Sequence, residues 1–293
     1  MSSPGGQAAN MRAAHSPRLA LVLGSGGVRS VAALGIADAL ATAGMKPDLM
    51  VGCSSGALFG ACIAMGMSGA QGLEAATRLW SRELTEKKRW RAYFELLAPK
   101  LMGFDSGFSL RDARLIRERV ELAFGDTMLD DLPTALRVVT TEVSSGESVV
   151  LTHGPVAAAV RASMALPLIF PSVSFAGRQL VDGVLSDPLP VSAARDAHTI
   201  VTLGFRGALP RRIDRPARLI GQVTTTMINN LQQARLGAAQ AAGQRMLHLD
   251  VEIDRRIGLW ETAAMPRIYE LGRRAAESQL QAIRCMLDVS LAA

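Results

Sequence analysis

The feature that most constrains this chain is a Gly-x-Ser-x-Gly turn that directly follows an apolar run. Residues 48–51 end in apolar side chains, the turn spans Gly52 to Gly56, and helical spacing of apolar residues resumes at Ala57. This pattern predicts a strand, a sharp turn and a helix, with Ser54 at the apex. Such a turn needs glycine two residues either side of the serine, because a Cβ there would collide with the strained serine backbone.

The position of Ser54 predicts a nucleophile. A serine at a helix start lies beside backbone N–H groups, which would stabilise negative charge on a carbonyl under attack. The same pattern also arises by chance in chains that contain much glycine and serine, so the turn alone does not establish the role. A catalytic interpretation therefore requires an anion site and a base elsewhere in the chain.

A glycine-rich loop near the start of the chain offers the anion site. It spans Gly24 to Ser30, after an apolar run at residues 19–23 that is typical of a strand buried on both faces. Its N–H groups, ahead of a helix expected at about residues 30–43, can bind a nucleotide phosphate or a reaction oxyanion. The dinucleotide pattern would need glycine where Arg29 stands, so we prefer the oxyanion. Arg29 either neutralises charge, braces the loop or is an ordinary surface arginine.

Two kinds of base are available to activate the serine hydroxyl. Asp182 follows an apolar strand that a hairpin turn at residues 176–178 delivers, and open α/β sheets place their sites at strand ends. Taken alone, an aspartate before glycine is more often a turn cap. The order Ser54, Asp182, His248 would also suit an α/β-hydrolase triad, although that fold has several strands before its serine turn and only one is expected here. The remaining histidines carry no distinctive local pattern: His15, His153 and His198.

Length and composition favour one α/β domain. The chain has 293 residues, 49% of them hydrophobic and 4% aromatic, which suits a core of alanine, leucine and valine. We expect a flexible N-terminal tail over residues 1–17, without the apolar segment of a signal peptide, and a domain over 18–293. Helices from about residue 216 are expected to cover the sheet. No apolar run reaches about 18 residues, so no membrane-spanning helix is expected.

The cysteines and the net charge indicate the surroundings of the protein. Cys53, Cys62 and Cys285 lack the spacing of metal ligands or of a disulfide framework, which favours a reducing, cytoplasmic compartment and no metal. The net charge of +6 favours an anionic partner. No nucleic-acid motif is present, so phospholipid headgroups are preferred to nucleic acid, with a plain solvated basic surface as the alternative.

One segment bears on membrane contact. Residues 86–97 are basic first, then aromatic and apolar, as in an interfacial segment that lies on a bilayer. The alternative, which we prefer, is a packed helix with a solvated basic end. The expected location is cytoplasmic, with peripheral attachment to the inner membrane surface as the second interpretation.

Taken together, four motifs resemble those of the patatin-like phospholipase family. They occur in the family's order and rough spacing over about residues 19–204: Gly24 to Arg29, Gly52 to Gly56, Ser163 to Pro167 with Phe170-Pro171, and Asp182-Gly183. The resemblance implies a three-layer α/β/α fold with a mainly parallel central sheet. It also implies a Ser-Asp dyad that uses no histidine, metal or cofactor, and a substrate that is a lipid or another acyl ester.

The family's catalytic roles can be carried over to residues of this chain. The resemblance makes Ser54 the nucleophile and Asp182 its base, in a lipase, phospholipase A or lysophospholipase type of reaction. The oxyanion hole would consist of N–H groups of three residues, with a basic residue beside them: Gly26, Gly27, Val28 and Arg29.

This chain departs from the family at three positions. The family often has glycine where Ser30 stands, threonine at Cys53 and glycine at Val184. Ser30 can cap the helix that follows, whereas Val184 bears on the geometry beside Asp182. These departures motivate a second hypothesis, a membrane-associated regulatory or binding protein with little turnover.

Overall fold

A single sheet of eight strands organises the part of the chain that is described. The computed structural model describes residues 16–80, 83, 92, 101, 108–210, 212–253, 257–258 and 261–289. The strands are β1 (Leu19–Leu23), β2 (Leu49–Cys53), β3 (Ala135–Glu142), β4 (Ser148–Leu151), β5 (Val173–Phe175), β6 (Arg178–Asp182), β7 (Thr199–Leu203) and β8 (Met246–Leu249).

The sheet is mostly parallel, with an antiparallel edge. Its order is β5-β6-β3-β2-β1-β7-β8, and β4 pairs with β3 off this path. The pairs among β1, β2, β3, β7 and β8 are parallel, whereas β4, β5 and β6 pair antiparallel. The carboxyl ends of the parallel strands therefore meet at one edge, which is where open α/β sheets place their sites.

Alternation along β1 shows that both faces of the sheet are covered. Leu19, Leu21 and Leu23 belong to one buried cluster, whereas Ala20 and Val22 belong to another on the opposite face. A strand buried on both faces reads as a continuous apolar run, as residues 19–23 do.

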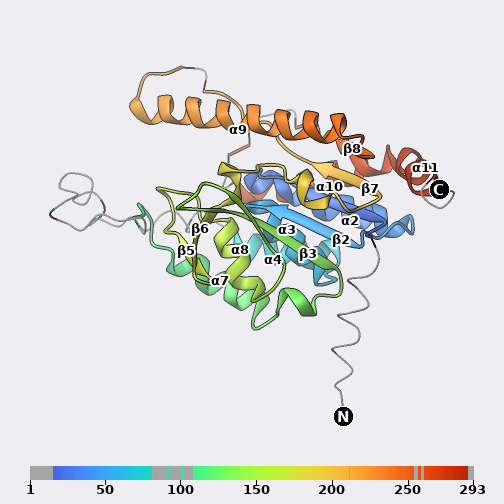
Figure 1. Ribbon diagram of the computed structural model, residues 1–293, viewed down its shortest axis with the longest axis horizontal. Coiled ribbons are helices and arrows are strands. Elements are labelled where there is room, and N and C mark those ends of the chain that lie inside the picture. The colour runs from blue at the N-terminus through green and yellow to red at the C-terminus, as the bar shows by residue number, and fades with distance from the viewer. Residues whose placement is uncertain are drawn as a thin grey trace, which may run out of the picture.

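Helices cover the sheet on both faces. The α-helices are α2 (Ala32–Thr42), α3 (Ser55–Ala64), α4 (Gly69–Leu79), α7 (Arg114–Phe124), α8 (Val156–Ser163), α9 (Pro216–Ala241), α10 (Met265–Glu277) and α11 (Leu280–Val289). The first cluster includes residues of α2, α3, α8 and α10, and the second includes Ala239 of α9. Figure 1 shows α9 along the top of the molecule and α7 and α8 below the sheet. The three-layer α/β/α fold with a mainly parallel sheet is thus confirmed.

Short 3-10 helices connect several of these elements. They are η1 (Gly27–Val31), η3 (Leu129–Asp131), η4 (Gly183–Leu185), η5 (Val191–Ala194) and η6 (Thr262–Ala264). The glycine-rich loop therefore enters a 3-10 turn before α2 begins. Because η1 begins inside the loop, at Gly27, it also fixes the direction of the loop amides that it contains.

The described helices give no membrane span, since none combines the length and the apolar character that crossing a bilayer requires. Residues 1–15 of the expected tail lie outside the described residues. So do residues 86–97, apart from Ala92. The domain boundary at residues 17 and 18 and the interfacial segment therefore stay predictions.

Candidate active site

Ser54 sits on a sharp turn between β2 and α3. Its backbone has φ of 57° and ψ of −126°, a region that L-residues other than glycine rarely occupy. A Cβ at Gly52 would lie 2.5 Å from the Cα of Ala57, and one at Gly56 would lie 2.3 Å from the carbonyl oxygen of Leu23. Either side chain would push α3 away from the strands, so the turn can form only with glycine at both positions.

The strained backbone of Ser54 is held by Ser163, a residue for which the sequence predicted no role. The hydroxyl of Ser163, the last residue of α8, accepts the N–H of Ser54 at 2.7 Å. The same hydroxyl donates to the carbonyl oxygen of Val139 in β3 at 2.7 Å. Ser163 thus ties the serine turn to the neighbouring strand. Its only sequence signal was membership of the Ser-Met-Ala-Leu-Pro motif.

Asp182 reaches Ser54 because β6 runs antiparallel to β3. Cys53 pairs with Val139, and the next residue of β3, Thr140, pairs with Asp182. Because β4 pairs along the other side of β3, β6 lies on the same side of β3 as β2, just beyond the end of β2, and Asp182 therefore ends its strand beside Ser54. The Ser54 hydroxyl donates a 2.8 Å hydrogen bond to Oδ2 of Asp182, across 128 residues of sequence.

Asp182 is a buried carboxylate with few donors. Its exposed fraction is 2%, and Oδ1 accepts the N–H of Val184 at 2.9 Å. Burial raises the pKa of Asp182 to about 7, although the hydrogen bonds from Val184 and Ser54 act in the opposite direction. Such a group is partly ionised at neutral pH and can accept a proton there. The donor is the backbone N–H of Val184, so this hydrogen bond does not depend on the departure from glycine at that position.

Cys53 lies beneath this pair and stays a thiol. Burial, together with the charges of Asp182 and Asp187, raises its pKa well above the ordinary value. The thiolate is the nucleophilic form of cysteine, so the environment keeps Cys53 unreactive. The environment of this turn therefore disfavours the preceding sulfur as a nucleophile.

The glycine-rich loop makes a contact that the sequence did not predict. The N–H groups of Gly26 and Gly27 donate to the hydroxyl of Ser55, at 3.1 Å and 2.9 Å. That hydroxyl also lies 2.8 Å from the hydroxyl of Ser30. The N–H of Val28, in contrast, has no acceptor among the residues that the structure describes. The loop therefore offers one open amide and two that already have an acceptor.

Ser30 does not act as the helix cap that the sequence suggested. No side-chain cap is present at the start of η1 or of α2. Ser30 is instead buried, with an exposed fraction of 1%, and its hydroxyl bonds the Ser55 hydroxyl. The departure from glycine thus adds a hydroxyl to the network beneath the loop.

Arg29 braces the loop, which agrees with one of the interpretations above. Its Nε donates to the carbonyl oxygen of Gly26 at 3.1 Å, and Nη1 donates to that of Arg206 at 3.0 Å. The guanidinium lies 5.0 Å from the ring centre of Phe205, within cation–π range. Because Arg206 and Phe205 follow β7, Arg29 joins the loop after β1 to the loop after β7.

His248 does not lie near Ser54. It belongs to β8, three strands from β2, which at about 4.8 Å per strand is on the order of 14 Å away. Its Nδ1 shares a 2.8 Å hydrogen bond with Thr202, and its Nε2 lies 3.7 Å from Asp250. The structure thus brings Asp182 to Ser54 and leaves His248 at the sheet edge.

The other two described histidines are also remote from the turn. His153 is exposed and bonds Asp130. His198 is exposed just before β7, at the end of the sheet opposite Ser54, where its N–H donates to Pro17. His15 lies outside the described residues. Neither described histidine is placed to activate the serine.

A second buried carboxylate, Asp187, lies in the segment after Asp182. Its exposed fraction is 2%, and burial raises its pKa to about 6 against the opposing charge of Arg235. Nε of Arg235 lies 3.4 Å from Asp187, and Nη2 donates to the carbonyl oxygen of Ser186 at 2.9 Å. Arg235 belongs to α9, so this helix is anchored beside the dyad. No sequence pattern pointed to either residue.

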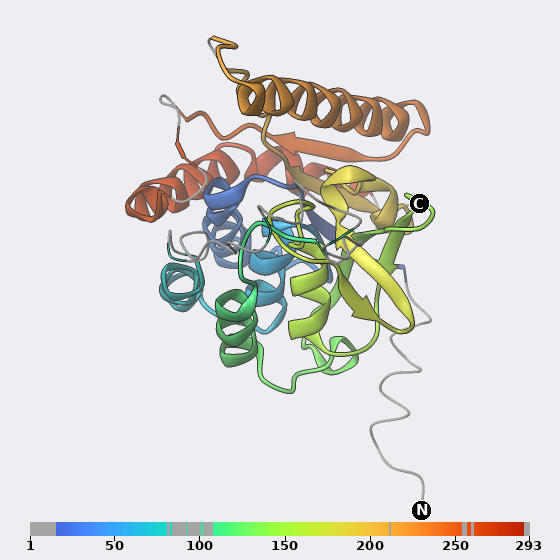
Figure 2. The ribbon, with the colours of Figure 1, turned by 90° about the vertical axis from the view of Figure 1, so that its left-hand side faces the viewer.

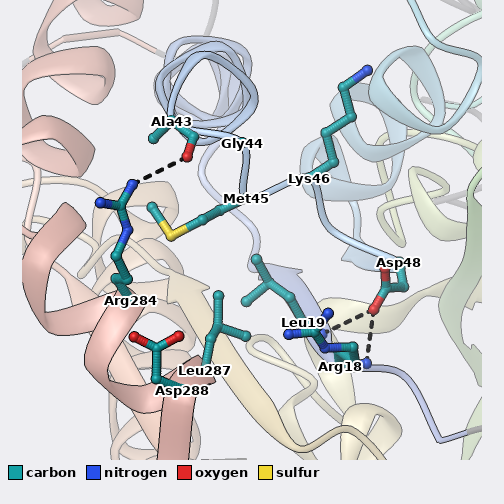
Figure 3. A pocket seen from close by; sticks show the side chains of 10 residues that line it. All are labelled: Arg18, Leu19, Ala43, Gly44, Met45, Lys46, Asp48, Arg284, Leu287 and Asp288. Carbon is teal, nitrogen blue, oxygen red and sulfur yellow. Dashed lines mark hydrogen bonds between the residues drawn. The ribbon is translucent and has the colours of Figure 1, made fainter. Parts of the chain in front are cut away.

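The hollow in Figure 3 lies at the end of the sheet opposite Ser54, where the parallel strands begin. It encloses about 250 Å³ where β1 begins, and the N–H groups of Arg18 and Leu19 donate to Asp48 there. Arg284 donates to the carbonyl oxygen of Ala43 on the other side. These contacts fix how the strands begin and are far from the serine turn. No cluster of three metal-ligand side chains occurs among the described residues.

Comparison with known proteins identifies the family. The sequence model described as "Patatin-like phospholipase" matches residues 21–195, more than half of the chain. The matched range contains the glycine-rich loop, the serine turn and Asp182. This chain belongs to the patatin-like phospholipase family.

Curated relatives are longer than this chain. An uncharacterized NTE family protein of Mycobacterium tuberculosis is 31% identical over 253 residues, which cover 83% of this chain and 64% of the relative. Patatin-like phospholipase domain-containing protein 7 of Rattus norvegicus is 31% identical over 190 residues, which cover 64% of this chain and 13% of that protein. The chain thus spans less than two thirds of the length of these relatives.

The solved structures that resemble this fold are more distant. VipD from Legionella pneumophila has a TM-score of 0.48 at 14% identity, and the match covers 90% of this chain and 67% of VipD. ExoU from Pseudomonas aeruginosa, in complex with SpcU, has a TM-score of 0.46 at 16% identity, with 92% and 53% covered.

Proposed function

We propose that this protein is a serine acyl hydrolase that cleaves carboxylic esters of lipids through a dyad of Ser54 and Asp182. The observation that carries the proposal is the 2.8 Å hydrogen bond from the Ser54 hydroxyl to a buried carboxylate whose pKa is raised to about 7. A serine hydroxyl is a weak nucleophile until a base takes its proton, and Asp182 has both the position and the pKa of such a base.

Acylation is the first step. Oγ of Ser54 attacks the acyl carbonyl carbon while its proton passes to Oδ2 of Asp182, and the carbonyl oxygen becomes an oxyanion. Loop N–H groups stabilise this charge. The open amide of Val28 is one donor, and the amides of Gly26 and Gly27 would share their hydrogens between Ser55 and the oxyanion. Collapse of this tetrahedral intermediate breaks the ester bond, and the alcohol leaves with the proton from Asp182.

Deacylation returns the enzyme to its starting state. A water molecule attacks the acyl-Ser54 carbonyl, and Asp182 takes the proton of that water. The second oxyanion collapses, the bond to Oγ of Ser54 breaks, and the carboxylic acid departs. Ser54 recovers its proton from Asp182. Every proton in this cycle is carried by one carboxylate, so the proposed cycle needs no histidine as a base.

The test is hydrolysis by matched variants. Nitrophenyl esters of graded acyl length, then phospholipid and lysophospholipid vesicles, are given to wild type, Ser54→Ala, Asp182→Asn and His248→Gln. We expect kcat to fall by roughly three or more orders of magnitude in the first two variants and to stay near wild type in the third. A large loss in His248→Gln, with activity kept in Asp182→Asn, would reject the dyad in favour of the triad. The acyl-length profile of wild type then narrows the substrate.

A lipid-binding protein with little turnover is the second candidate. It is favoured by one observation, the engagement of the Gly26 and Gly27 amides by Ser55. This candidate predicts that wild type hydrolyses none of the esters and still binds lipid vesicles, equally well with Ser54→Ala. Turnover of any ester that depends on Ser54 would exclude it.

A further inference from the structure

The first half of α9 carries a row of exposed apolar side chains. Exposed fractions are 51% for Leu219, 59% for Ile220, 50% for Val223 and 66% for Met227. At 3.6 residues per turn these four side chains fall within an arc of about 100°. They therefore form one apolar face, on a helix that the sequence predicted to cover the sheet.

The opposite side of α9 is the one that contacts the molecule. Gln232 and Ala239 are buried there, and Ile228 and Leu236 pack against the second cluster. The exposed face is a separate surface, and in both views α9 forms the top edge of the molecule (Figures 1 and 2). Scattered exposed apolar residues need no explanation, but a contiguous row of large ones marks an interaction surface.

Arginines flank the apolar face where the helix begins. Residues 211–218 contain four arginines and one acidic residue. Arg212, Arg215 and Arg218 are exposed. Arg218 pairs with Asp214 at 2.8 Å, whereas Arg212 and Arg215 have no ion-pair partner among the described residues. The N-terminal end of a helix adds positive potential of its own. The surface is thus apolar at its centre and cationic at its end.

The first half of α9 is held in a fixed position relative to the dyad. Asn229 accepts the N–H of Gly207 at 2.7 Å and donates to its carbonyl oxygen at 2.9 Å, which ties α9 to the segment after β7. Further along, Arg235 is anchored on Ser186 and Asp187, next to Asp182. Whatever binds the exposed face of α9 is therefore held in a defined orientation to the serine turn.

We propose that this surface docks the protein on an anionic lipid bilayer. The α9 docking face consists of Leu219, Ile220, Val223 and Met227, with Arg212 and Arg215 at its cationic end. The apolar side chains enter the boundary between headgroups and acyl chains, and the arginines contact anionic headgroups. The inference deepens the proposed function and rests on it in one respect: a lipid hydrolase needs its substrate surface beside its nucleophile.

A second copy of the chain is a poorer occupant of this surface. In a two-fold dimer the same patch meets itself, so one interface would contain the cationic ends of both chains. With a net charge of +6 on each chain, self-association is opposed by charge, whereas an anionic bilayer is attracted.

The experiment is cosedimentation with vesicles of phosphatidylcholine alone and of phosphatidylcholine with phosphatidylglycerol. Wild type is expected to bind the anionic vesicles at low salt and to lose binding as NaCl is raised. Arg212→Gln with Arg215→Gln is expected to weaken binding by about fivefold per arginine. Ile220→Gln with Met227→Gln is expected to weaken binding at every salt concentration, because the lost contacts are apolar.

Matched controls separate the face from general effects. Leu122→Gln removes an apolar side chain that is 88% exposed on α7, and Arg195→Gln with Arg245→Gln removes two exposed charges elsewhere. Both are expected to bind like wild type. Thermal unfolding checks that every variant is folded. Ser54→Ala is expected to bind fully, so a failure of the proposed catalysis would leave this binding result intact.

Two results would overturn the proposal. In the first, wild type does not sediment with anionic vesicles, or the α9 variants sediment as wild type does. In the second, gel filtration shows a dimer that Ile220→Gln with Met227→Gln dissociates, which would assign the surface to a second copy of the chain.

Discussion

Single hydroxyl groups decide the geometry of the nucleophile. Ser54 keeps its positive φ because its N–H has a buried acceptor, and that acceptor is itself fixed to β3 through Val139. Backbone strain persists only where the surroundings over-determine it. In the proposed mechanism Ser163 is therefore a positioning residue, which acts on the reaction through Ser54.

Ser163→Ala should lower kcat by about 10- to 100-fold, with KM for a short nitrophenyl ester little changed. The physical reason is that the N–H of Ser54 loses its acceptor, at a cost of about 1–3 kcal/mol for an unsatisfied buried donor. Steady-state kinetics well below the unfolding temperature measure the effect. Thr199→Val is the control, since it removes a buried hydroxyl at the other end of the sheet. Equal losses of kcat in both variants would contradict a positioning role.

The raised pKa of Asp182 predicts how activity depends on pH. The base works only when ionised, and its pKa is raised from about 4 to about 7. Activity should therefore be low at pH 5, rise through half its maximum near pH 7 and level off above. A histidine would give a similar curve, so the profile is also measured in His248→Gln. A midpoint that stays near pH 4, or one that moves in this variant, would count against Asp182 as the base.

At the scale of elements, the position of the glycine-rich loop depends on how closely α2 packs against α10. A Cβ at Gly272 of α10 would lie 2.2 Å from the carbonyl oxygen of Ala32, and one at Gly35 of α2 would lie 2.1 Å from that of Tyr269. The two backbones thus touch at a pair of glycines. Since α2 follows η1 and the loop directly, this crossing also fixes the loop amides.

Gly272→Ala should destabilise the protein by about 1–3 kcal/mol, because the added methyl group overpacks a contact between two backbones. Gly237→Ala in α9 is the matched control. Nothing lies within 4 Å of its Cβ position, so a gain of up to about 1 kcal/mol is expected from the better helix former. Urea unfolding at constant m-value gives both free energies. A Gly272→Ala variant as stable as wild type would show that the crossing can relax.

Element prediction from the sequence worked where the pattern was local. The run at residues 19–23 and the hairpin turn at residues 176–178 appear as β1 and the β5–β6 turn. The helices expected from about residue 216 appear as α9, α10 and α11. β8 was missed, because a four-residue edge strand has too few residues to show a period.

The face that α9 turns to solvent could not be predicted either. Its inward and outward sides both carry large apolar residues, such as Leu236 and Met227. Periodicity identifies a helix, and only the packing shows which side is covered.

At the scale of the whole molecule, the candidate site could be predicted as a set of residues but not as a network. Ser54 and Asp182 stood in recognisable motifs, and their proximity follows from a register that no local pattern encodes. Ser55 and Asp187 matter because of contacts with residues far along the chain, with the glycine-rich loop and with α9. Such contacts arise from the tertiary fold, so a single sequence gives no signal for them.

Because β6 pairs with β3 through a short antiparallel contact, the protein could lose activity without unfolding as a whole. Ser54, the proposed nucleophile, follows a strand of the parallel body of the sheet, whereas Asp182, the proposed base, arrives on the β5–β6 hairpin at the edge, through three residue pairs with β3. Edge elements open locally at a lower free energy than the core does. If the hairpin detached alone, the dyad would be lost while the remaining strands stayed paired. The hairpin is thus a part of the fold whose attachment can set the fraction of active molecules.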